Sequence, residues 1–129
     1  MGAKLEELLV ASLLVISAVA FVSTFFLQGF SLTKEEALEI SRKSETIQRY
    51  MDRVVSYSVQ VEYWNRTQVN RVREDFPNTR KVYPENRNIW IIVWIIKTTM
   101  DSNSSASVIN HVIDDETGQI VYEGQGGLR

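Results

Sequence analysis

The sequence predicts an α+β fold, in which an N-terminal transmembrane helix precedes a small domain with an amphipathic helix packed on an antiparallel sheet of about four strands. The first observation is an uncharged apolar run from residue 8 to residue 30. The second is a capped helical pattern that starts near residue 33, and the third is a set of alternating strand-like segments. We therefore expect an anchor over residues 1–30, one domain over 31–124 and a flexible tail over 125–129.

The run Leu8–Phe30 is long enough to cross a bilayer as a helix. At about 1.5 Å per residue it covers roughly 35 Å, whereas the hydrocarbon core is about 30 Å thick. Two alternatives involve cleavage. The small residues Ala18-Val19-Ala20 are typical of a signal-peptide site, and Gly2 with Glu7 resembles the type IV pilin pattern. We favour a retained anchor because cleavage after Ala20 would leave an apolar N-terminus, and no basic residue precedes Gly2.

The composition argues against several classes of function. The formal net charge is −2, so nucleic acid is not an expected partner. Cysteine is absent, which excludes disulfides, thiolate metal sites and a cysteine nucleophile. The single histidine, His111, lies in a predicted strand, where a core or surface role is commoner than metal binding. No hydrolase or phosphate-loop motif occurs, so we expect neither an enzyme nor a bound cofactor or metal.

The orientation of the domain relative to the membrane rests on two opposing signals. Basic residues after the anchor outnumber those before it, which does not favour a domain outside the cell. Two glycosylation sequons, at Asn65 and Asn103, fall in predicted loops and favour an extracytoplasmic domain. We expect the domain outside.

The first helix begins at a capping box formed by Thr33 and Glu36. Apolar residues then recur at helical spacing from Ala37 to Val54, with a polar interruption that predicts a break near Lys43-Ser44. This stripe is expected to face the core.

Two strands with different patterns follow. Residues 55–64 alternate between apolar and polar side chains, as in a strand with one wet face, whereas Ile89–Ile96 is apolar on both faces and reads as a central strand. The second apolar face needs a cover, which could be a helix from residues 65–88, a dimer partner or a target protein. The 65–88 segment is basic, which fits a solvated loop or, alternatively, a surface for anionic lipid or a cell-surface polymer.

The residues Trp90, Ile92 and Trp94 share one face of this central strand. Such a cluster is either core or an anchor for a partner protein, because tryptophan is enriched at interface hot spots. We name these three residues as candidate partner-binding residues and leave the core alternative open.

The last two strands are predicted at residues 108–114 and 119–123, joined by a tight turn in which Gly118 supplies a positive φ. The acidic pair Asp114-Asp115 favours a turn over a calcium site, because the spacing of an EF-hand is absent.

The segments LTKEEALEIS, IWIIVW and VIDDETGQIVY, which span roughly residues 31–124, resemble the PepSY family pattern. The matching hairpin turn is Asp115-Glu116-Thr117-Gly118. The resemblance implies a small, membrane-attached, extracytoplasmic α+β module that binds or restrains another protein, which could be a peptidase. It carries over no catalytic residue. The alternative is a structural subunit of a membrane complex or of a pilin-like filament, and homo-oligomers are left open.

Overall fold

The computed structural model describes residues 31–101 and 105–128. This part of the chain folds into helices and strands in the order helix, helix, strand, helix, 3-10 helix and three strands. The helical elements are α3 (Lys34–Arg42), α4 (Glu45–Met51), α5 (Arg66–Asp75) and the 3-10 helix η1 (Pro77–Lys81). The strands are β1 (Val54–Trp64), β2 (Ile89–Thr98), β3 (Ala106–Asp114) and β4 (Ile120–Leu128).

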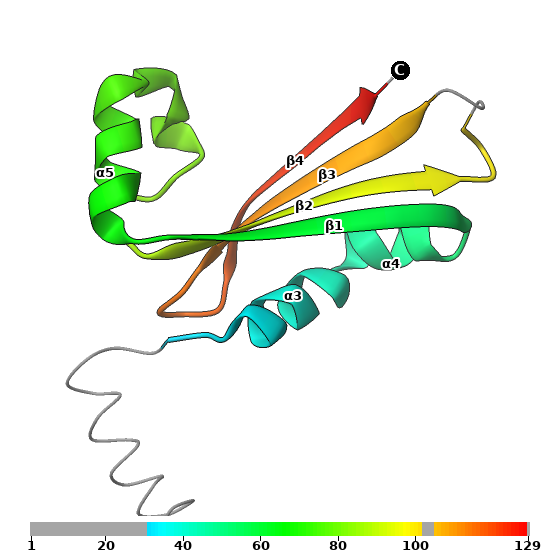
Figure 1. Cartoon of the computed structure of the whole chain (residues 1–129), viewed down its shortest axis with the longest axis horizontal. Helices are drawn as coiled ribbons and strands as arrows, with labels where there is room; N and C mark the ends of the chain where they lie inside the picture. The colour runs from blue at the N-terminus through cyan, green and yellow to red at the C-terminus, as the bar shows by residue number, and fades with distance from the viewer. Residues whose placement is uncertain (1–30, 102–104, 129) are drawn as a thin grey trace, which may run out of the picture. The chain divides into compact units, whose positions relative to one another are not determined.

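The four strands form one antiparallel sheet in the order β1-β2-β3-β4. Figure 1 shows α3 and α4 along one face of this sheet, whereas α5 and η1 lie over the opposite face at one end. The predicted α+β class and the antiparallel sheet of about four strands are therefore confirmed. No helix in the described ranges is long and apolar enough to cross a membrane, and the anchor predicted over residues 8–30 lies outside those ranges.

The start of α3 is the predicted capping box. The Thr33 hydroxyl accepts a hydrogen bond from the Glu36 amide, and the Glu36 carboxylate accepts one from the Thr33 amide. The helix ends at Arg42, and Ser44 caps α4 by accepting from the Ile47 amide. The predicted break at Lys43-Ser44 is confirmed, and it separates two short helices.

The larger core lies between α3, α4 and the sheet. It contains Ile92, Trp94 and Ile96 of β2, together with Ala37 of α3 and Ile47 of α4, all of them fully buried. These β2 residues alternate with Ile91, Val93 and Ile95, which project to the other face. The helical stripe predicted as core therefore packs on one of the two apolar faces of β2.

The second apolar face is covered in part by α5 and η1. Val69 of α5 is buried against Ile89 and Val112, with Trp64 and Tyr83 packed around them. Of the three covers considered for this face, a helix from residues 65–88 is thus the one that the structure contains. Two of the basic side chains of this segment have a structural role, because Arg73 donates to the carbonyls of Arg80 and Tyr83, and Arg80 donates back to that of Arg73.

The end of the chain differs from the prediction. A flexible tail was expected from residue 125, but β4 continues to Leu128. Gly126 pairs with Val108, and Leu128 pairs with Ala106. Glycine has a low strand propensity, but the effect is modest. Here the pairing with the long strand β3 outweighs it.

Candidate functional site

A network of hydrogen bonds, buried at Ser41 and partly buried at Glu123, joins α3 to three strands of the sheet. The Trp94 indole N–H donates to Ser41 Oγ over 2.7 Å, and Ser41 Oγ lies 2.6 Å from His111 Nδ1. On its other side His111 Nε2 lies 2.7 Å from Glu123 Oε1. The Thr46 hydroxyl also belongs to this network, because it donates to Glu123 Oε2 over 3.0 Å. The predicted core-or-surface role of His111 is resolved in favour of the core, since this residue is fully buried.

The direction of each hydrogen bond in this network follows from the two residues at its ends, Trp94 and Glu123. An indole nitrogen only donates and an ionised carboxylate only accepts, so His111 Nε2 carries a proton toward Glu123. In the neutral ring, Nδ1 then accepts from the Ser41 hydroxyl. Every group is satisfied, which explains how a histidine and a serine are tolerated in the core.

Ser41, His111 and Glu123 are also the three residue types of a hydrolytic triad. The arrangement differs from a nucleophilic site because Ser41 is fully buried and its oxygen is engaged by both Trp94 and His111. A substrate carbonyl has no open approach to this oxygen. The geometry supports a structural polar network that fixes α3 on the sheet.

The carboxylate of Glu123 predicts a pH dependence of stability. The hydrogen bond from His111 lowers the pKa of Glu123 below its ordinary value of 4.5, burial opposes this change, and the Thr46 hydrogen bond adds to it. A lowered folded-state pKa means that the stabilisation is fully present above pH 4.5 and is lost as the pH falls through the folded-state value.

We expect the difference in unfolding free energy between the native chain and Glu123→Gln to be constant from pH 7 to about pH 5 and to shrink at lower pH. NMR titration of the Glu123 carboxyl provides the direct measurement. The matched variant Thr46→Val should raise the pKa of Glu123 only slightly, because it leaves the His111 hydrogen bond intact. An ordinary carboxyl titration in the native chain would contradict the network.

The candidate partner-binding residues lie on the face of β2 that α3 and α4 cover. Ile92 and Trp94 are fully buried, and Trp90 is half-buried with its indole N–H bonded to Asp115. A partner could reach Ile92 or Trp94 only after the helices moved away. The burial therefore favours the core alternative for this cluster.

The two sequons have different positions. Asn65 is exposed at the junction of β1 and α5, where its side-chain oxygen caps α5 by accepting from the Gln68 amide. Asn103 lies outside the described residues. The Asp114-Asp115 pair sits at the β3–β4 turn as predicted, with Gly118 at φ 73°. Among the described residues no group of three or more potential ligands could hold a metal ion.

An open groove of about 520 Å³ lies between α4, the end of β2 with Met100 and Asp101, and the helix-side surface of β3 and β4. Its charged lining is balanced, with Arg49 and Arg53 facing the hollow together with Asp52 and Asp101. Asp101 is already engaged, because its carboxylate accepts from the amide and the hydroxyl of Thr98. The formal charges of the four ionisable side chains that line the groove cancel.

The outer edge of β1 is the most distinctive surface of the domain. β1 pairs with β2 on one side, and no described strand pairs with its other side. Natural edge strands are commonly protected by lysine, proline or short length. β1 has eleven residues, contains no lysine, proline or glycine, and has Glu62 as its one charged residue. Such an edge is a template for pairing with another polypeptide.

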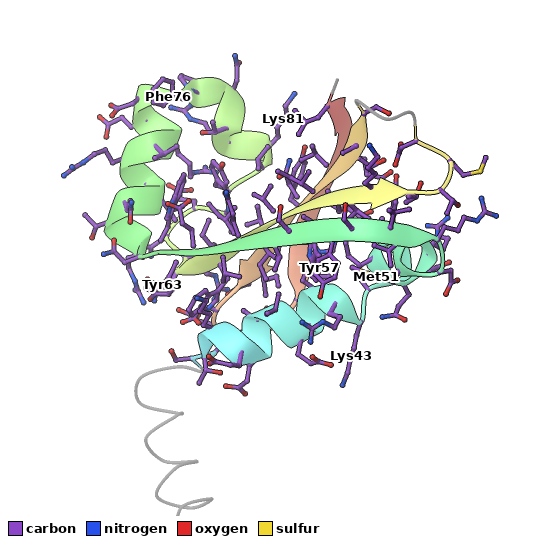
Figure 2. All side chains as sticks on the ribbon, turned by 45° about the vertical axis from the view of Figure 1, so that its right-hand side comes forward. Lys43, Met51, Tyr57, Tyr63, Phe76 and Lys81 are labelled. Carbon is purple, nitrogen blue, oxygen red and sulfur yellow. The ribbon has the colours of Figure 1, made fainter. Side chains whose placement is uncertain are left out.

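Three large apolar or aromatic side chains of this strand are exposed. Val55, Tyr57 and Tyr63 are 61%, 51% and 44% exposed, respectively. The ring of Tyr57 lies 5.7 Å from that of Trp94, and the ring of Tyr63 lies 5.0 Å from that of Trp90. Figure 2 shows both tyrosines on the α3 side of β1, well away from Phe76 on the other side of the sheet. Sequence reasoning identified the alternation of β1 but not its edge position.

Comparison of the chain with family models, curated proteins and solved structures gave no match.

Proposed function

We propose that this chain is a membrane-anchored, extracytoplasmic protein-interaction module that binds an extended segment of a partner protein along β1. The observation that carries the proposal is the unprotected eleven-residue edge of β1 with its exposed Tyr57 and Tyr63. Unpaired main-chain groups supply affinity in this mode, and alternate side chains supply specificity. Apolar side chains of the added strand would lie beside the tyrosines, and polar ones beside Ser58 and Gln60.

Two sequence features support the other parts of the proposal. The uncharged run at residues 8–30 supports the anchor. The capping box and the Asp115–Gly118 turn are the local motifs of the PepSY resemblance, which names a peptidase as one class of partner.

Site-specific photo-crosslinking tests the binding surface. A benzoylphenylalanine placed at Tyr57 or Tyr63 of the full chain, in its own membrane, should yield a discrete protein adduct. The matched control is Phe76, an aromatic residue that is 62% exposed on the opposite side of the sheet. Adducts from Phe76 alone, or from none of these positions, would overturn the proposal. A peptidase in the adduct would support the PepSY resemblance.

The orientation is tested separately by protease treatment. We expect protease added to intact cells to cleave residues 31–129 and to leave the anchor in the membrane. Cleavage in inverted vesicles, together with full protection in intact cells, would place the domain on the cytoplasmic side. This outcome would leave the β1 binding surface unaffected.

A further inference from the structure

We infer that the polypeptide that pairs with β1 is β1 of a second copy of this chain, which makes the module a homodimer with a continuous sheet. This inference rests on the proposed function, because it names the occupant of the same edge. It is carried by the sequence symmetry of the strand and by the face to which each side chain projects.

Residues 57–63 read YSVQVEY, which is close to a palindrome about Gln60. An antiparallel pair of identical strands with a two-fold axis at Gln60 places Tyr57 opposite Tyr63 and Val59 opposite Val61. Such an isologous contact brings the same patch of both copies together. Each tyrosine meets a tyrosine and each valine meets a valine, and both contacts are favourable cross-strand pairs.

The faces of the sheet also match in this arrangement. Tyr57, Val59, Val61 and Tyr63 pair with Ile96, Trp94, Ile92 and Trp90 of β2, so all four lie on the helix side. A two-fold axis perpendicular to the sheet leaves the helix layers of both copies on one side. The apolar row of one copy therefore continues the apolar row of the other, and the partly exposed tyrosines are covered.

The single charge of β1 is compatible with this register. Glu62 lies opposite Ser58 of the other copy rather than opposite a second glutamate, so no like charges meet directly. Gln60, which is exposed, meets its own copy at the axis. By contrast, the other edge strand, β4, has glycine at positions 124, 126 and 127 and no comparable symmetry. Tethering both copies to one bilayer would raise their effective concentration and favour such a contact.

The chain contains no cysteine, so one introduced cysteine reports on a self-contact without interference. Two differently tagged full-length copies carrying Gln60→Cys are co-expressed in the membrane and oxidised. We expect a disulfide-linked dimer that carries both tags. The matched control Gln119→Cys, at an exposed position in the β3–β4 turn, should stay monomeric. Equal dimer from both variants, or none from Gln60→Cys, would overturn the inference.

A charge variant provides a second test of the dimer. Gln60→Lys places two like charges at the axis and should reduce the photo-crosslinked dimer from Tyr57 by up to about fivefold, whereas Gln119→Lys should leave its yield unchanged. A Tyr57 adduct that contains only a different protein would overturn the inference that a second copy occupies the β1 edge, but it would leave the proposed function intact. Absence of any Tyr57 or Tyr63 adduct, together with a monomeric Gln60→Cys chain, would overturn both.

Discussion

Replacing Trp94 by alanine is expected to unfold the domain at physiological temperature. Trp94 is fully buried in the larger core, and its indole N–H is bonded to Ser41. Removing a buried tryptophan side chain costs about 3–5 kcal/mol, which is a large part of the ~5–15 kcal/mol by which a domain is stable. The variant also removes the donor that positions the Ser41 hydroxyl toward His111. Urea or thermal unfolding of the full chain measures the loss.

Trp94→Phe provides the control for this experiment. It retains most of the ring volume but removes the N–H, so we expect a smaller loss of about 1–3 kcal/mol from the altered polar network. A Trp94→Ala chain that melts close to the native chain would contradict the core position. Loss of a binding partner with an unchanged melting temperature would instead restore the interface alternative for Trp90, Ile92 and Trp94.

Asp115→Ala is expected to have the second largest effect. The Asp115 carboxylate is 2% exposed, and its Oδ1 accepts from the Leu32 amide over 2.9 Å and from the Trp90 indole over 2.8 Å. Alanine leaves both donors without their acceptor, at a cost of about 1–3 kcal/mol for each. We therefore expect a clear drop in the free energy of unfolding and faster hydrogen exchange at the Leu32 amide.

The matched variant Asp115→Asn keeps an oxygen in the place of Oδ1 and removes the charge. It should retain slow exchange at Leu32 and lose less stability than Asp115→Ala. Equal stability of the two variants would show that the hydrogen bonds to Leu32 and Trp90 contribute little.

Local patterns predicted the fold where the determining contacts are close in sequence. The Thr33–Glu36 cap, the break at Lys43-Ser44 and the turn at Gly118 each depend on residues within a few positions, and the structure contains all three. The alternation of β1 and the two apolar faces of β2 were likewise predictable from the sequence, because strand periodicity depends only on which face is buried.

Features that depend on distant pairing were not predictable in the same way. The extension of β4 to Leu128 comes from pairing with β3, which the glycines at positions 126 and 127 do not suggest. The network of Ser41, His111 and Glu123 joins residues up to about eighty positions apart, and each alone resembles an ordinary polar position. The edge position of β1 depends on strand order, so the significance of the palindrome became visible only in the sheet.

The bond between Leu32 and Asp115 has a mechanical consequence. Any tension that reaches the domain along residues 1–31 arrives at Leu32, whose amide is held at the β3–β4 turn. The same carboxylate oxygen holds Trp90 of β2, and the Trp90 ring packs on Tyr63 of β1. In the proposed arrangement, these contacts form a short path through the sheet between Leu32 and the β1 edge, in parallel with the covalent path through α3.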